Sequence, residues 1–200
     1  MEGILFYWFA WISWTGTTFF MPKTKERLCL SGFLLILIYS TNFTFHIGQY
    51  SVNAALFLLA IISYAYIGML SLKRLTYSII VSMILSVVYI GLHIIVLTDP
   101  VWVMFGLEVF MAVPVAILSL ILLKELQLPI LIAAYIHGEI AYTYLFQNTN
   151  TSYITGSVAF LDYVSMAIAI VFAWTAYVGF INKVKLRVDK PTKHVKEGIH

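Results

Sequence analysis

The sequence is poor in charged residues. Its 200 residues include only 12 Lys and Arg and 9 Asp and Glu, or 10% of the chain, whereas soluble proteins carry about 25%. Apolar residues make up 62% of the chain, and the mean hydropathy is +0.93. Because so few charged groups cannot cover the surface of a 22.7 kDa protein in water, the composition excludes a soluble globule and indicates a protein solvated by lipid.

The sequence also lacks the common signatures of known chemistry. Cys29 is the single cysteine, which excludes an internal disulfide. Because it lies between Leu28 and Leu30, we interpret it as a small apolar residue. The chain contains no nucleophile elbow, no P-loop, no dinucleotide fingerprint and no H-E-x-x-H pair, and it shows no internal repeat. These motifs therefore point to no enzyme class and no cofactor.

Long apolar runs dominate what is present. Runs of about 17 to 25 apolar residues are typical of membrane-spanning helices, and seven occur here: 3–21, 28–45, 54–72, 75–98, 101–123, 126–146 and 158–181. Only short connectors and a polar tail remain, so there is no room for a soluble domain. We predict an all-α, polytopic transmembrane bundle of seven helices over residues 1–181, followed by a basic cytoplasmic tail over residues 182–200.

The basic residues predict the orientation of this bundle. All 12 lie in alternate connectors or in the tail: Lys23, Lys25, Arg27, Lys73, Arg74, Lys124, Lys183, Lys185, Arg187, Lys190, Lys193 and Lys196. The connectors 46–53, 99–100 and 147–157 contain none. Basic residues concentrate on the cytoplasmic side, so we expect the C-terminus inside and the N-terminus outside. This distribution reflects topology and gives no reason to expect nucleic-acid binding.

Five ionisable residues lie within the predicted spans, where such groups are costly and often functional. They are His93, Glu108, His137, Glu139 and Asp162. With a rise of 1.5 Å per residue, all five fall about 6 to 13 Å from the outer ends of their spans. Four helices are therefore predicted to bring acidic or imidazole groups to similar depth in the outer half of the bilayer.

Neighbouring residues indicate which way these groups point. In the fourth span, a polar stripe at steps of three and four should face protein: Ser78, Ser82, Ser86, Tyr89 and His93. In the seventh, Asp162 begins a stripe of small residues that should pack closely: Ser165, Ala169, Ala173 and Ala176. On the sixth span, His137 and Glu139 cannot both point in one direction. Pro114 should kink the fifth span by freeing the carbonyl of Phe110.

Three interpretations of this polar cluster follow from residue types and depth. His93 with Glu108, or Glu139 with nearby tyrosines, can simply hydrogen-bond and fix helix register. The imidazoles and carboxylates can instead relay protons or ions if a wet cavity reaches them. A metal site is the third interpretation, since nitrogen and oxygen ligands suit zinc, although no pair has the usual i, i+4 spacing. The sequence therefore predicts no metal and no cofactor.

A family resemblance adds to this interpretation. The opening Met1-Glu2-Gly3-Ile4-Leu5-Phe6-Tyr7-Trp8, the length and the aromatic-rich helices resemble the YphA-like membrane proteins of Bacillus-type bacteria. The resemblance implies a multi-pass protein of the cell membrane whose activity is uncharacterised, and it assigns no site residues.

These observations leave three functional classes, among which a non-enzymatic role is favoured. The protein is expected to be a structural or interaction component whose partners are the lipid bilayer and other membrane proteins. The first alternative is a small-solute or proton-coupled transporter that uses the outer-half cluster. The second is a membrane-embedded metalloenzyme, which requires His93 and His137 to converge with carboxylates on one ion.

Overall fold

The structure is a computed structural model that describes residues 2–99, 101, 107–123, 127–146 and 153–188. Within these residues it contains seven α-helices: α1 (Ile4–Phe20), α2 (Lys25–Ser40), α3 (Ala54–Gly68), α4 (Leu72–Thr98), α6 (Ala112–Leu122), α7 (Gln127–Phe146) and α8 (Val158–Val188). The predominantly helical fold that the sequence predicts is therefore confirmed. The connector around Lys124, residues 147–152 and the tail from residue 189 lie outside the described residues.

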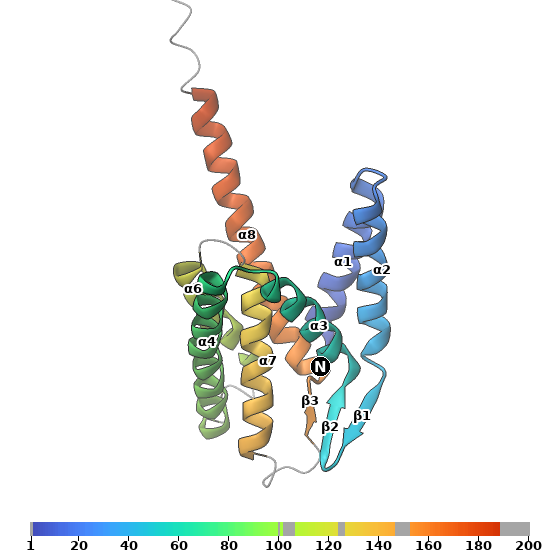
Figure 1. The fold of residues 1–200 in the computed structure, drawn as a ribbon, viewed down its shortest axis with the longest axis vertical. Coiled ribbons are helices and arrows are strands. Elements are labelled where there is room, and N and C mark those ends of the chain that lie inside the picture. Colours follow the sequence, from blue (N-terminus) through green and yellow to red (C-terminus); the bar gives the residue numbers. More distant parts are fainter. Residues whose placement is uncertain (1, 100, 102–106, 124–126, 147–152, 189–200) are drawn as a thin grey trace, which may run out of the picture.

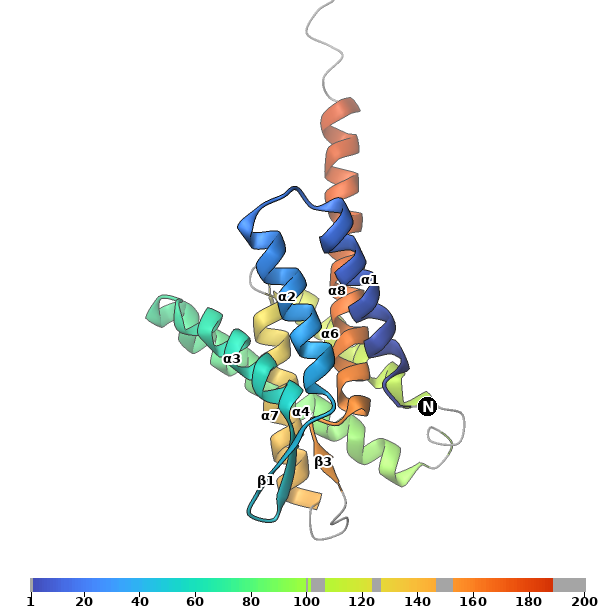
Figure 2. The ribbon, with the colours of Figure 1, turned by 90° about the vertical axis from the view of Figure 1, so that its right-hand side faces the viewer.

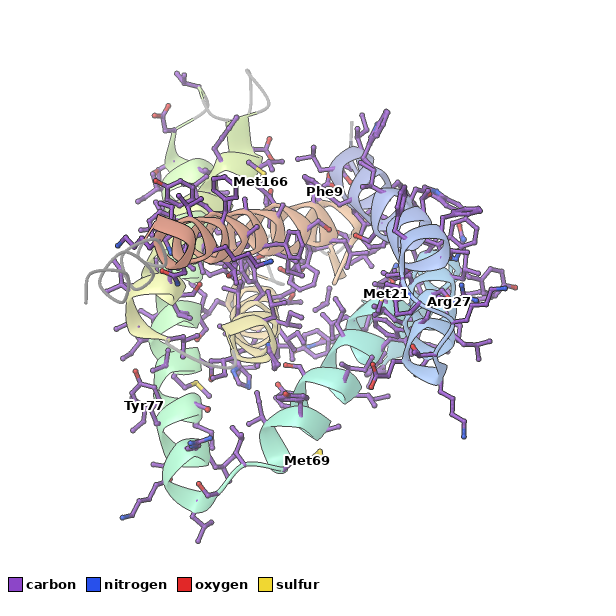
Figure 3. The ribbon with its side chains drawn as sticks, turned by 90° about the horizontal axis from the view of Figure 1, so that it is seen from above. Phe9, Met21, Arg27, Met69, Tyr77 and Met166 are labelled. Atoms are coloured by element: carbon purple, nitrogen blue, oxygen red, sulfur yellow. The ribbon has the colours of Figure 1, made fainter. Side chains whose placement is uncertain are left out.

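The helices are arranged as a pair beside a bundle. Figure 1 shows α1 and α2 running antiparallel on one side, while α4, α6, α7 and the first half of α8 pack together on the other. Helix α3 bridges the two groups, and Figure 2 shows α3 and α4 inclined steeply to α1, α2 and α8. Seen from above in Figure 3, Met69 in the α3–α4 turn and Tyr77 on α4 lie on the outside of this arrangement.

The ends of the helices fall into two groups. In Figure 1 the α1–α2 turn, the α3–α4 turn and the C-terminal end of α8 lie at the upper ends of their helices. The N-terminus and the three strands lie toward the lower end of the molecule. The described connectors that carry basic residues thus share one end, and the uncharged hairpin lies at the other.

A small β-sheet at the lower end departs from the all-α prediction. Its strands are β1 (Thr44–Ile47), β2 (Tyr50–Asn53) and β3 (Ile154–Thr155), in the order β1-β2-β3. Strand β1 pairs antiparallel with β2, and β2 pairs in parallel with β3. Helix α2 consequently ends at Ser40, so the prediction of a span continuing to residue 45 was wrong. The asparagine Asn53 ends the hairpin and begins α3, because its side chain accepts a hydrogen bond from the backbone N–H of Ala55 at 2.9 Å.

The fifth predicted span changes helix type within its described residues. A 3-10 helix, η1 (Leu107–Met111), precedes α6, which begins only at Ala112. This change of helix type lies just before Pro114, and the kink predicted at that proline stays a prediction. Proline has no N–H to donate, and in the first turn of α6 that group needs no helical partner, which explains the position of the break.

Two helical segments of the described residues are long and apolar enough to cross a bilayer. They are Leu72–Val96 in α4 and Val158–Lys185 in α8, while Ala54–Gly68 and Glu108–Leu122 are apolar but shorter. The polar stripe predicted on α4 faces protein, since all five of its members are buried: Ser78, Ser82, Ser86, Tyr89 and His93.

The predicted small-residue stripe on α8 is correct only at its beginning. Asp162 is buried, but Ala173 and Ala176 are exposed. The buried face of this helix is formed instead by Ala167 and four larger residues: Phe160, Leu161, Val164 and Val171. Residues 172–180 of this helix are all exposed, and Figure 1 shows the C-terminal part of α8 rising past α4, α6 and α7.

Candidate functional site

The most buried carboxyl group in the described residues is that of Glu139 on α7. The residue is fully buried, and three donors reach its two oxygens. Oε2 accepts a hydrogen bond from the Tyr89 hydroxyl at 2.8 Å. Oε1 accepts one from the Tyr153 hydroxyl at 2.8 Å and one from the Gly156 backbone N–H at 3.0 Å. The carboxylate therefore ties together α4, α7 and the segment that enters α8.

Two glycines make this arrangement sterically possible. A Cβ at Gly138 would lie 2.5 Å from Cδ1 of Tyr89, so only glycine lets the tyrosine ring lie against α7. Gly156 has a φ of +73°, in the left-handed region that glycine adopts readily. A Cβ there would also lie 2.6 Å from Cβ of Leu56. At both positions, any side chain larger than hydrogen would therefore clash with a neighbouring side chain.

A second set of contacts holds the segment 153–156 in place. The Thr143 hydroxyl donates to the Glu139 carbonyl at 2.9 Å, and the Thr155 hydroxyl donates to the Thr143 hydroxyl at 3.1 Å. Burial, followed by the adjacent Glu139 carboxylate, raises the pKa of the Tyr153 hydroxyl, which therefore stays protonated and remains a donor. Together with the pairing of β3 with β2, these bonds fix the segment across the lower end of the bundle.

An aromatic group surrounds His93 on the neighbouring turn of α4. The imidazole ring lies 4.2 Å from the ring of Tyr89, 5.0 Å from that of Tyr142 and 5.2 Å from that of Tyr163. Its Nδ1 lies 3.2 Å from the Tyr89 carbonyl oxygen. Aromatic packing thus encloses the imidazole, and Tyr89 connects it to the carboxylate site.

Glu108 reaches the same cluster through a tyrosine. The Tyr163 hydroxyl donates to Oε2 of Glu108 at 3.4 Å, and the Tyr163 ring lies 6.5 Å from that of Tyr89. Glu108 and Glu139 are therefore linked through Tyr163 and Tyr89. Glu139 itself accepts its hydrogen bonds from two tyrosine hydroxyls and one backbone N–H, and not from Glu108.

The two remaining candidates lie elsewhere. His137 points to the opposite side of α7, where its Nε2 lies 2.9 Å from the Tyr64 hydroxyl and its Nδ1 lies 3.5 Å from the Ser82 hydroxyl. Asp162 accepts hydrogen bonds from the backbone N–H groups of Gly3 at 2.7 Å and Phe6 at 2.8 Å. It therefore caps the N-terminus of α1, where a negative charge is favoured by the helix dipole.

The separation of the two histidines removes the geometry that a metal site requires. His93 packs among tyrosines, whereas His137 binds side chains of α3 and α4. Among the residues that the structure describes, no group of three or more His, Cys, Asp or Glu side chains is placed to hold a metal ion. The convergence expected of a metalloenzyme is thus not found there.

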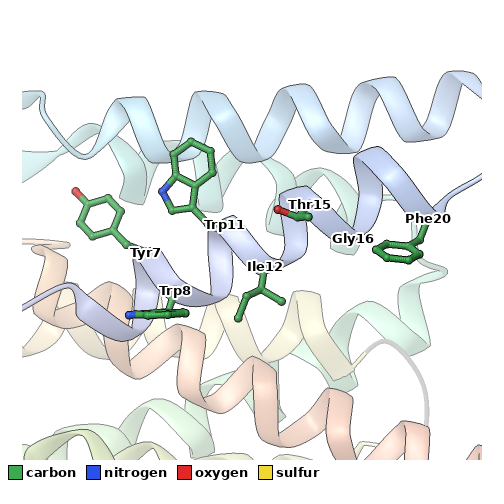
Figure 4. Close-up of a pocket in the computed structure, with 7 residues that line it drawn as sticks. All are labelled: Tyr7, Trp8, Trp11, Ile12, Thr15, Gly16 and Phe20. Atoms are coloured by element: carbon green, nitrogen blue, oxygen red, sulfur yellow. The ribbon is translucent and has the colours of Figure 1, made fainter.

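A surface hollow lies on α1, away from this cluster. It has a volume of about 570 Å³ and is lined by seven residues of that helix: Tyr7, Trp8, Trp11, Ile12, Thr15, Gly16 and Phe20. Figure 4 shows that these side chains spread to both sides of α1. Because its wall comes from one helix and carries no ionisable acid or base other than a tyrosine, the hollow is part of the apolar flank.

Comparison with known proteins places the chain in a family. Residues 2–197 match the YphA-like integral membrane proteins, which covers nearly the whole chain. The chain belongs to this family. Within it, the chain is similar to the "Uncharacterized protein YphA" of Bacillus subtilis (strain 168), with 28% identity over 183 residues that cover 88% of this chain and 89% of the relative. No solved structure matches the chain.

Family membership confirms the resemblance that the sequence showed and the placement in a membrane. The biochemical activity of the family member from Bacillus subtilis is uncharacterised by its own description. Neither comparison assigns a chemical role to a residue of this chain.

Proposed function

We propose that this YphA-like chain is a multi-pass protein of the plasma membrane with seven spans, the N-terminus outside and the C-terminus in the cytoplasm. The distribution of the 12 basic residues supports this topology. So does the position of the α1–α2 and α3–α4 turns on the same side of their helices as the end of α8 (Figure 1).

Reporter fusions test the topology. A reporter fused after His200 should be active in the cytoplasm, and one inserted near Asn150 should be active outside. A third fusion, with the reporter in the α3–α4 turn next to Lys73, provides the second cytoplasmic position. If the reporters at His200 and Asn150 are found on the same side, the seven-span topology is wrong.

Within this topology we propose that the protein acts as a structural or interaction component of the membrane. We further propose that the Glu139 site is a structural lock, which means that its hydrogen bonds hold α4, α7 and the segment 153–156 in one fixed arrangement. The observation that carries the proposal is that three donors, from α4 and the segment 153–156, hydrogen-bond to the two oxygens of the carboxylate. Helices in lipid gain little from the hydrophobic effect, so polar contacts of this kind determine how they pack.

One observation favours a second candidate function, which is proton-coupled transport. Successive contacts join Glu108, Tyr163, His93, Tyr89 and Glu139, so groups that carry exchangeable protons run from η1 through α8 and α4 to α7. A relay requires the carboxylate to change its protonation state, whereas a lock requires it to keep its three bonds.

The variant Glu139→Gln separates the two functions. Glutamine keeps one oxygen but turns an NH₂ group toward donors, so a lock predicts a lower melting temperature in detergent and no loss of proton flux in proteoliposomes. Infrared difference spectra of the parent should then show no carboxyl band titrating between about pH 5 and 8, the window of a relay group. A band that titrates there and disappears in the variant, with an unchanged melting temperature, would replace the lock by the relay. Glu2→Gln, at the exposed N-terminus, is the matched control.

A further inference from the structure

The β1–β2 hairpin is the feature that the functions above do not explain. It joins the lower end of α2 to α3 through a two-residue turn, Gly48–Gln49, in which Gly48 has a φ of +63°. In the sheet order β1-β2-β3, one edge of β1 has no partner strand among the described residues. All four residues of β1 are exposed.

The exposed side chains of this hairpin are sorted by face. Phe43, Phe45 and Ile47 alternate along the chain and so point to one side of the sheet, with 45%, 53% and 55% of their surfaces exposed. Thr44 and His46 point to the other side, where His46 Nδ1 lies 3.0 Å from the Ser51 hydroxyl. The hairpin therefore has an apolar face and a polar face.

The apolar face continues onto the flanks of two helices. The ring of Phe43 lies 5.0 Å from that of Tyr39 at the end of α2, and the ring of Phe45 lies 6.1 Å from that of Phe57 on α3. Tyr39 is 66% exposed and Phe57 is 37% exposed. The sequence contains no Asp, Glu, Lys or Arg anywhere in 28–72. In a membrane protein such an uncharged, continuous apolar surface is suited to lipid.

The backbone fixes how deep this surface lies. The Phe43 carbonyl accepts a hydrogen bond from the Ala54 N–H at 2.9 Å, so by alternation the N–H and C=O groups of Thr44 and His46 point toward the open edge. Unsatisfied backbone groups cost several kcal/mol each in hydrocarbon. The strand edge therefore needs water or lipid headgroups, while its aromatic side chains favour the acyl chains.

These two requirements are met together only at the boundary between headgroups and acyl chains. We propose that the β1–β2 hairpin is an interfacial anchor, with the side chains of Phe43, Phe45 and Ile47 inserted into the acyl boundary of the adjacent leaflet and the strand edge at headgroup level. That leaflet is the outer one in the proposed topology. The inference rests on the membrane placement of the family and on no property of the Glu139 lock.

Spin labels at neighbouring positions test this placement. In a Cys29→Ser background, Phe45→Cys and Ile47→Cys place a nitroxide on the apolar face, and Thr44→Cys places one on the polar face of the same strand. The proteins are reconstituted into vesicles of phosphatidylethanolamine and phosphatidylglycerol. Collision rates are then measured with oxygen, which concentrates in the acyl region, and with a water-soluble nickel chelate.

We expect the ratio of oxygen to nickel collisions to be several-fold higher at positions 45 and 47 than at position 44. Ile61→Cys, on a side chain of α3 that is 64% exposed, is the control for a label in lipid and for correct folding. Equal access of the nickel chelate at 44 and 45 would place the hairpin in water. An immobilised label at 45 that neither reagent reaches would show a protein partner on this face. Either result overturns the proposal, and neither depends on which side of the membrane the hairpin lies.

Discussion

A methyl group added to Gly138 tests the packing of α7 against α4. In Gly138→Ala the new Cβ would lie 2.5 Å from Cδ1 of Tyr89, closer than real Cβ atoms come to other heavy atoms. The tyrosine ring must therefore move, and its hydroxyl donates to the buried Glu139 carboxylate at 2.8 Å. The substitution should disturb packing and a charge-assisted hydrogen bond together.

The size of the effect follows from three contributions. Alanine stabilises a helix by about 1 kcal/mol relative to glycine. Overpacking a well-filled interior costs about 1 to 3 kcal/mol, and losing a hydrogen bond to a charged group costs about 1.5 to 3 kcal/mol. The net loss is about 1.5 to 5 kcal/mol in the free energy of unfolding, which at about 2 to 4 °C per kcal/mol for a chain of this size lowers the melting temperature by roughly 3 to 20 °C.

The assay is thermal unfolding of the purified protein in detergent, followed by circular dichroism. Gly91→Ala is the matched control, because Gly91 lies within α4 and a Cβ there meets no atom within 4 Å. That control should unfold at the parental temperature or slightly above it. If Gly138→Ala behaves like Gly91→Ala, the tyrosine is not seated against the glycine and the account of the site is wrong.

Three further predictions use four substitutions, with the melting temperature in the same detergent as the measurement. Tyr153→Phe removes one donor from the carboxylate and should lower it by a few degrees, since about 1.5 to 3 kcal/mol is lost; no change would show that this hydroxyl is not needed. Gly156→Ala should cost more than Gly48→Ala, because both have positive φ but only the former meets a side chain; equal losses would contradict the close approach. Asp162→Ala leaves two buried N–H groups of α1 without an acceptor, at about 1 to 3 kcal/mol each, and a parental melting temperature would refute the cap.

Helical periodicity allowed part of this site to be predicted from the sequence. The steps of three and four between Ser78, Ser82, Ser86, Tyr89 and His93 place these residues on one face, and all are buried against protein. The divergence of His137 and Glu139 followed from the angle between positions i and i+2, and the structure places them on different neighbours. Both features depend only on local helix geometry, which a sequence pattern reports directly.

The hairpin shows where counting apolar residues fails. Phe43, Thr44, Phe45, His46 and Ile47 alternate, and they are followed by Gly48-Gln49 and a second short alternation, which is a hairpin signal. A hydropathy run ignores the period of the pattern and extended the second span to residue 45. Because apolar residues at a membrane boundary suit either a helix or an interfacial strand, only the period distinguishes the two.

The predicted pairing of Glu139 with nearby tyrosines is confirmed by Tyr89 and Tyr153, but the sequence did not identify which tyrosines they are, and it did not predict Gly156 as a partner. Tyr153 and Gly156 lie in the connector after α7, and they reach the carboxylate because β3 pairs with β2, more than 100 residues earlier in the chain. Depth along a helix predicted which residues share a level of the bilayer. It did not predict which of them share a face, and so it grouped Asp162 with a cluster to which it does not bind.

The ionisable residues of the predicted spans have a common position that depth alone does not reveal. Asp162 on α8 holds the first turn of α1, His137 on α7 binds side chains of α3 and α4, and Glu139 joins α4, α7 and the entry to α8. Each therefore lies where elements distant in sequence meet. In lipid, where apolar side chains distinguish poorly between neighbouring helices and solvent, such polar junctions supply the specificity that a hydrophobic core supplies in water. An ionisable residue inside a predicted span therefore indicates, in the first place, a contact between elements that are distant in sequence. It indicates transport only when its protonation state is shown to change.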